Sequence, residues 1–261
     1  MLAKLLKYEL KATARWFMPL YAALVLFALI SRFLLYNDPF VKNEATGFLQ
    51  IVRILSMSVY VFLFVGIMVV TFVVIIQRFY KSLLGDEGYL MFTLPVQTWK
   101  HIMSKLLIAM LWNLSSAVVG LCSIMLLIPA QDLADFGLLF TGINEYFGTI
   151  GYFTILFLML ASLVFGIIEM YTAIALGHLF RKHKLLASFG MYIGLNTISQ
   201  MAFILIVPFF LNTIGSLSEP LHITPGRLNT LILITGIIFA VLAAVCYIVT
   251  NIILKRKLNL E

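Results

Sequence analysis

Charged residues are scarce in this sequence: Asp, Glu, Lys and Arg together make up 11% of its 261 residues. Soluble proteins carry about 25% charged residues, because a folded chain of ordinary size presents a large polar surface to water. Hydrophobic residues here account for 62% of the chain. This composition excludes an ordinary soluble domain and is typical of an integral membrane protein.

Cysteines are few and catalytic motifs are lacking. Cys122 and Cys246 each lie in an apolar run without a second thiol nearby, so we interpret them as small buried hydrophobic residues. The sequence has no Gly-x-x-x-x-Gly-Lys-Ser/Thr phosphate loop, no His-Glu-x-x-His and no Gly-x-Ser-x-Gly. His178 and His183 flank basic residues, a setting that repels a metal cation. We therefore expect no catalytic residue, no metal site and no cofactor in this chain, and do not expect an enzyme.

Long apolar runs are what the sequence does contain. Crossing the roughly 30 Å hydrocarbon core of a bilayer takes about 20 helical residues, because only helices and closed barrels satisfy their backbone hydrogen bonds in lipid. The sequence predicts one all-α transmembrane domain over residues 1–261. Its six predicted spans are Phe17 to Tyr36, Ile51 to Gln77, Ile102 to Ile128, Tyr146 to Leu176, Leu185 to Leu211 and Leu228 to Leu254.

The basic residues predict the orientation of these spans. The formal net charge is +7, but the Lys and Arg side chains lie between the apolar runs rather than in a patch interleaved with aromatics, which excludes a nucleic-acid surface. All but four of the 18 fall in alternate segments, which the positive-inside rule assigns to the cytoplasm. We therefore predict a multi-pass membrane protein with both termini in the cytoplasm. The four exceptions are Arg32, Lys42, Arg53 and Arg227.

Residues 1–15 have an amphipathic pattern. Lys4, Lys7, Lys11 and Arg15 recur at helical spacing, while leucines occupy other faces. The pattern favours a helix lying in the cytoplasmic membrane interface. A frayed basic segment that only sets the topology is the alternative interpretation.

The second cytoplasmic segment, residues 78–101, is too apolar for a free loop. The apolar side chains from Tyr89 to Leu94 need to be shielded from water. Exposed apolar patches of this kind mark partner contacts. Packing against the protein's own helices is the alternative. Pro95 suits the first turn of the helix that follows.

At this segment the sequence resembles the membrane subunits of bacterial ABC-2 type exporters. The resemblance is carried by Asp86-Glu87-Gly88, then Thr93-Leu94-Pro95-Val96, then Lys105-Leu106-Leu107. It extends to the layout of the chain, with an amphipathic first helix, six spans, cytoplasmic termini and a short basic tail. In that family a short re-entrant element precedes the last span, and residues 212–227 are the corresponding outer loop here.

The resemblance implies partners and a role for the loop. In that family the loop between spans two and three docks on a separate cytoplasmic ABC ATPase, which binds ATP and Mg²⁺ and transmits its closure to the membrane helices. A second permease subunit, identical or not, completes the path, and membrane lipids surround it. The residues that the resemblance places at or near the ATPase contact are Asp86, Glu87, Gly88, Tyr89, Leu94 and Pro95.

Polar residues inside the predicted spans are candidates for a translocation path. Glu169 lies well inside span four, where a carboxyl is a functional-site hypothesis by default; a hydrogen-bonded contact between helices is the alternative. Asn196 and Gln200 share one face of span five and either line a path or join helices. Gly190 and Gly194 favour close helix approach in the same span.

Three functions are compatible with these features. The leading hypothesis is a permease subunit that exports a hydrophobic or amphipathic substrate, such as a peptide, lipid or drug, with ATP hydrolysed by a separate subunit. An immunity or sensor protein that binds a partner or peptide without transport has the same topology. An intramembrane enzyme acting on lipids would need a polar partner for Glu169 in a cavity that water reaches.

Overall fold

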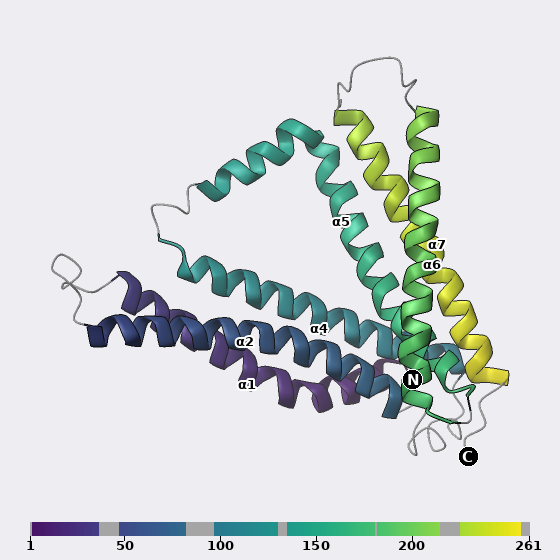
Figure 1. Cartoon of the computed structure of the whole chain (residues 1–261), viewed down its shortest axis with the longest axis horizontal. Helices are drawn as coiled ribbons and strands as arrows, with labels where there is room; N and C mark the ends of the chain where they lie inside the picture. Colours follow the sequence, from purple (N-terminus) through teal and green to yellow (C-terminus); the bar gives the residue numbers. More distant parts are fainter. Residues whose placement is uncertain are drawn as a thin grey trace. The chain divides into compact units, whose positions relative to one another are not determined.

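The computed structural model describes residues 2–36, 47–81, 97–129, 135–180, 182–214 and 225–256. These residues are helical apart from short turns (Figure 1). The six long helices are α1 (Leu2–Tyr36), α2 (Gly47–Phe79), α4 (Thr98–Leu127), α5 (Asp135–Gly177), α6 (Lys184–Ile214) and α7 (Pro225–Arg256).

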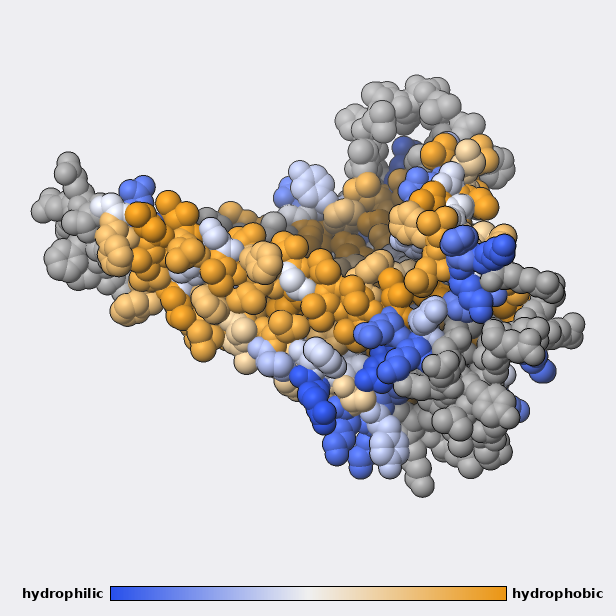
Figure 2. Space-filling model, turned by 60° about the horizontal axis from the view of Figure 1, so that its bottom comes forward, coloured by the Kyte–Doolittle hydropathy of each residue, from blue (hydrophilic) through white to orange (hydrophobic). Residues whose placement is uncertain are grey.

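All six of these helices are long and apolar enough to cross a membrane, as the sequence predicts. Their candidate spans are between 23 and 37 residues long, against about 20 needed to cross the hydrocarbon core. Their outer faces are apolar too: Phe62, Phe153 and Leu205 each expose more than 70% of their surface. Figure 2 shows hydrophobic residues along the helices of the chain, as a lipid environment requires.

Helix α1 differs in one respect from the expectation. The sequence favours a separate interfacial helix over residues 1–15, whereas Leu2–Tyr36 is one helix that includes Pro19 without an interruption. The candidate span accordingly begins at Leu6 rather than at Phe17. Within this first part Glu9 and Thr13 are buried, so this stretch of α1 packs against protein on one side. Its placement in the membrane interface stays a prediction.

The chain divides into two compact units, which are described separately. Unit 1 comprises Met1–Ile75 and Leu107–Leu138, and unit 2 comprises Ile76–Leu106 and Leu139–Glu261. Unit 1 thus holds α1, most of α2 and the later part of α4. Unit 2 holds the end of α2, the start of α4, α5 from Leu139 onward, and α6 and α7.

Unit 1 packs three helices around two apolar clusters. One cluster centres on Leu24, Ala28, Tyr60 and Ile67, and the other on Phe17, Ile108 and Trp112. Serine and threonine hydroxyls join the helices between these clusters, as is common in membrane bundles. The hydrogen bonds are Tyr21 with Ser116 at 2.7 Å, Thr71 with Ser116 at 3.0 Å and Tyr60 with Ser123 at 3.0 Å.

The C-terminal end of α4 is capped by a charge from α1. Arg32 donates a hydrogen bond of 3.0 Å from its guanidinium to the main-chain oxygen of Leu126. The last carbonyls of a helix have no partner within the helix and carry the negative end of its dipole. The cation of Arg32 therefore satisfies one of these carbonyls and offsets the dipole.

Unit 2 is built on α5, which is more buried than α6 and α7. Ile167, Ile168 and Ala173 are each at most 3% exposed, whereas α6 exposes most of its apolar side chains. Helices α6 and α7 are in contact, and Figure 1 shows them crossing at an angle. Phe239 of α7 contacts Phe203 of α6 and Phe165 of α5, at centroid distances of 4.6 and 5.5 Å.

Helix α5 contains a break that the predicted span Tyr146 to Leu176 does not anticipate. Gly148 has φ 66° and ψ −174°, a conformation outside the helical region that is essentially restricted to glycine. The main-chain oxygen of Phe147 accepts a hydrogen bond of 2.6 Å from the Asn229 amide of α7. A side chain from a distant part of the sequence therefore satisfies a carbonyl beside the break.

Candidate functional site

The carboxyl group of Glu169 lies at the contact between α5 and α6. Glu169 is 2% exposed. Ser199 donates a hydrogen bond from its hydroxyl to Oε1 at 3.5 Å, and the side chain of Asn196 hydrogen-bonds the same carboxyl. A buried carboxyl needs such partners because burying it without them is costly. Both partners come from α6, so the carboxyl joins the two helices.

The hydrogen bonds continue from Glu169 to the outer face of α6. Gln200 donates from Nε2 to Oδ1 of Asn196 at 2.7 Å. Because Oδ1 of Asn196 accepts this bond, its NH₂ group is the donor toward Glu169. Gln200 is exposed. The structure thus brings the three candidate path residues into one chain of hydrogen bonds, from a buried carboxyl to a surface amide.

A second polar contact lies one turn along α5, on the side of α7. The hydroxyls of Thr172 and Thr250 are 2.9 Å apart, and Thr172 also donates to the main-chain oxygen of Cys246 at 3.1 Å. Both threonines are at most 1% exposed. Residues three apart on a helix lie on neighbouring faces. Polar groups of α5 therefore contact both α6 and α7 in the same layer of unit 2.

An aromatic contact ties the end of α2 to this layer. The ring of Phe79 stacks on that of Tyr171, with 4.0 Å between centroids and 9° between planes. Phe79 is 0% exposed and Tyr171 is 1% exposed. Beyond Phe79, the rings of Tyr80 and His178 are in an edge-to-face contact with 5.1 Å between their centroids. The last turn of α2 is thus fixed to α5 only two residues from Glu169.

The start of α4 is also anchored within unit 2. Tyr247 of α7 donates a hydrogen bond of 3.1 Å from its hydroxyl to the main-chain oxygen of Trp99. Lys100 places its ammonium 5.5 Å from the centre of the Trp99 ring. Helix α2, which precedes residues 82–96, is therefore anchored on α5, and α4, which follows them, is anchored on α7.

The proposed ATPase-contacting residues lie outside the described part of the chain. They are Asp86, Glu87, Gly88, Tyr89, Leu94 and Pro95. Of the predicted outer loop 212–227, residues 215–224 also lie outside it. The roles of these segments stay predictions.

Several polar residues are buried although the sequence does not predict their burial. Glu9 is 7% exposed in α1, and His101 and Lys105 are 1% and 4% exposed in α4. Lys105 is one of the basic residues that predict the orientation of the spans, yet it lies two turns inside α4 rather than in a loop. Its long aliphatic stem allows burial, which composition and charge counting do not detect.

The chain matches no protein family, no curated protein and no solved structure. Among the described residues, His, Cys, Asp and Glu side chains form no group of three or more that could hold a metal ion. The candidate site is therefore defined by its own geometry: a hydrogen-bonded carboxyl within the helices, and an aromatic contact that joins it to the helix preceding residues 82–96.

Proposed function

We propose that this chain is the membrane-spanning subunit of a bacterial ABC-2 type exporter. It moves a hydrophobic or amphipathic substrate, such as a peptide, lipid or drug, across the plasma membrane with ATP hydrolysed by a separate subunit. Support comes from the six helices that are long and apolar enough to cross a membrane, and from the resemblance over residues 86–107. In this proposal both termini are cytoplasmic.

The observation that carries the proposal is the stacking of Phe79 on Tyr171. An exporter driven by a separate ATPase needs a mechanical connection from the cytoplasmic docking segment to the helices that line the path. Two flat rings in full contact and without exposure transmit displacement, because packed interiors are close-packed and compress little. A movement of the segment after Phe79 therefore reaches α5 at Tyr171, beside Glu169.

Within this mechanism the segment between α2 and α4 contacts the ATPase through Asp86, Glu87, Gly88, Tyr89, Leu94 and Pro95. Closure of the ATPase pulls on both flanking helices, which are anchored on α5 and α7. Rigid-body movement of packed helices is a common route for such transitions. Two permease subunits, identical or not, enclose the path between them.

The polar chain of Glu169, Asn196 and Gln200 supplies the part of the path that an amphipathic substrate requires. Intramembrane carboxyls are rare because they are costly, and they face a bundle interior or a substrate path. A shift of α5 relative to α6 changes the hydrogen bonds between Glu169 and its two partners on α6. The substrate's polar groups then exchange with these partners.

The test is co-expression with bacterial ABC ATPase subunits and reconstitution in lipid, followed by measurement of ATP hydrolysis. We expect a stable complex whose turnover falls in the Glu87→Ala/Tyr89→Ala double variant. Phe79→Leu removes the ring that stacks on Tyr171, so we expect it to keep the complex and uncouple hydrolysis from transport. Phe62→Leu, at a residue of α2 that is 78% exposed, is the matched control and should behave as wild type.

Failure to associate with any ATPase would contradict the proposal and favour an immunity or sensor protein. Equal turnover and transport in the Phe79 and Phe62 variants would reject the mechanical role of the ring. Replacing Glu169 by Gln keeps the size and hydrogen-bonding capacity of the side chain while removing its charge. Lost transport with normal ATPase association would assign Glu169 to the substrate path.

A further inference from the structure

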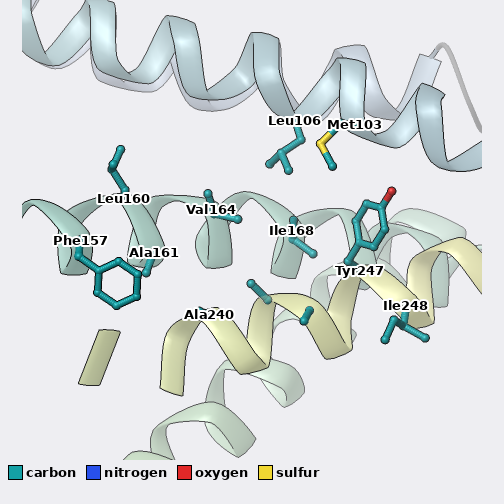
Figure 3. Close-up of a pocket in the computed structure, with 12 residues that line it drawn as sticks. Met103, Leu106, Phe157, Leu160, Ala161, Val164, Ile168, Ala240, Tyr247 and Ile248 are labelled. Atoms are coloured by element: carbon teal, nitrogen blue, oxygen red, sulfur yellow. The ribbon is translucent and has the colours of Figure 1, made fainter. Parts of the chain in front are cut away.

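An open apolar groove of about 420 Å³ lies within unit 2 between α4, α5 and α7 (Figure 3). Its floor is formed by buried residues, among them Leu106, Ala161 and Ala243, which are at most 8% exposed. Its rim is exposed, with Phe157 at 41% and Ile248 at 56%. Figure 3 shows the α5 and α7 side chains lining it from opposite sides.

The depth of the groove follows from the side chains on α7. Ala240, Ala243 and Ala244 line it where larger residues would fill it. At one end of the groove Gly236 leaves space for the Phe157 ring. A Cβ at this position would lie 2.7 Å from that ring. Volumes of about 300–1,000 Å³ are usual for small-molecule sites.

Length and end chemistry indicate what fills the groove. Along α5 it runs from Phe157 to Ile168, about 16 Å at 1.5 Å per residue. That is close to one leaflet of the hydrocarbon core, about half of 30 Å. An apolar groove as long as one leaflet and open along one side fits the acyl chain of a lipid.

The end of the groove near the start of α4 has the chemistry of a membrane interface. Tyr247 lines the groove and hydrogen-bonds Trp99 at 3.1 Å, and both residue types favour the headgroup level. Lys100 lies one turn before Met103, which lines the groove, and helical side chains lean toward the N-terminus. Its ammonium, 5.5 Å from the centre of the Trp99 ring, therefore supplies a positive charge near this end of the groove.

We propose that this groove binds an anionic phospholipid, with one acyl chain along α5 and α7 and its phosphate beside Lys100. The lipid belongs to the leaflet that contains the Thr98 end of α4. This inference is independent of the proposed function, because a protein that transports nothing carries the same groove. A lipid held here fills the space between α4, α5 and α7 and so stabilises unit 2.

The first experiment uses the full chain purified in detergent and titrated with phosphatidylglycerol or phosphatidylcholine, with bound lipid measured by native mass spectrometry. We expect saturable binding that favours phosphatidylglycerol. Lys100→Gln should weaken phosphatidylglycerol binding about fivefold, since one surface cation contributes on that order to anionic lipid binding. Lys182→Gln, at an exposed lysine away from the groove, should leave it unchanged.

A second pair of variants tests the groove itself. Ala244→Phe places a ring in the groove from its open side and should abolish saturable binding of both lipids. Val245→Phe adds a ring at the adjacent α7 position, which is 52% exposed and outside the groove, and should bind as wild type. Equal binding by these two variants would overturn the proposal.

A third measurement needs no substitution and therefore does not depend on folding of a variant. Phosphatidylglycerol with a photoreactive acyl chain is bound to the wild-type chain and cross-linked, and the modified residues are mapped. We expect labels on Met103, Leu106 and Ile248. Labels spread evenly over exposed residues such as Phe62 and Leu205 would identify ordinary surrounding lipid and reject the site.

Discussion

The indole nitrogen of Trp112 donates a hydrogen bond of 2.7 Å to the hydroxyl of Thr13, which joins α4 to α1 within unit 1. Thr13 is 1% exposed and Trp112 is 4% exposed. The Thr13 hydroxyl donates in turn to the main-chain oxygen of Glu9 at 2.8 Å. Beside this bond the Trp112 ring stacks on Phe17, with 4.3 Å between centroids. One residue of α4 thus contacts α1 through both polar and apolar groups.

Replacing Thr13 by Val should lower the free energy of unfolding by about 1 kcal/mol, because the buried Trp112 N–H loses its acceptor where water does not replace it. Unfolding in detergent, followed by tryptophan fluorescence and circular dichroism, measures the change. Thr197→Val is the control. Its hydroxyl is exposed and bonds only the Ile193 carbonyl of its own helix, so its effect should stay within about 0.5 kcal/mol. Equal effects would contradict the prediction.

The break in α5 gives a second prediction. Replacing Gly148 by Ala should destabilise the protein by about 1–3 kcal/mol, because a Cβ is strained at φ 66°. Gly142→Ala in the same helix is the matched control. A Cβ there meets nothing within 4 Å and no positive φ is required, so the substitution should be neutral or slightly stabilising. Thermal unfolding measures the change in stability of both variants. A neutral Gly148→Ala would mean that the break is not required.

The positions of the membrane spans follow from the sequence because length and hydrophobicity determine them. The predicted span Ile51 to Gln77 corresponds to α2, Gly47–Phe79, because an apolar run of this length has helix as its only open structure in lipid. The break at Gly148 does not follow, since a glycine in an apolar run is compatible with a continuous helix. Its conformation is stabilised by Asn229, which lies on another helix.

The sequence predicts the candidate site only where the residues concerned lie on the same helix, because their spacing then determines which face they share. Asn196 and Gln200 are four residues apart, and the expected shared face is confirmed by their hydrogen bond. The partner of Glu169 was not predicted, because the rotation of α5 and the helix that it faces are set by packing. The contact between Phe79 and Tyr171 does not follow from the sequence. The chain has 22 phenylalanines and 11 tyrosines, and their spacing does not distinguish these two from the rest.

A third prediction concerns the junction of α5 and α6. A Cβ at Gly177 would lie 2.5 Å from the main-chain nitrogen of Ser188, which cannot turn aside as a flexible side chain does. Gly177→Ala should therefore cost about 1–3 kcal/mol of unfolding free energy, as overpacking does. Gly190→Ala in α6 meets open space and should be neutral or stabilise by up to about 1 kcal/mol. Chemical unfolding compares the two, and a tolerated Gly177→Ala would show that the helices separate freely there.

The fourth prediction concerns pH. Burial lowers the pKa of His178, and the nearby positive charge of Lys184 lowers it further, against the opposing effect of the hydrogen bond at 2.9 Å to the Ile174 carbonyl. The unfolded chain therefore binds a proton at this ring more readily than the folded chain does. Stability that is present above pH about 6.5, the ordinary pKa of histidine, should decrease as the pH falls below it.

His178→Asn isolates this contribution, because an asparagine amide can donate to the Ile174 carbonyl but does not titrate. We expect the loss of unfolding free energy between neutral and mildly acidic pH to be smaller in the variant than in the wild type. Chemical unfolding of both proteins across that range measures the difference. Identical pH dependence would mean that the Tyr80 contact and the junction of α5 and α6 accommodate a charged imidazole, and that another group controls acid unfolding.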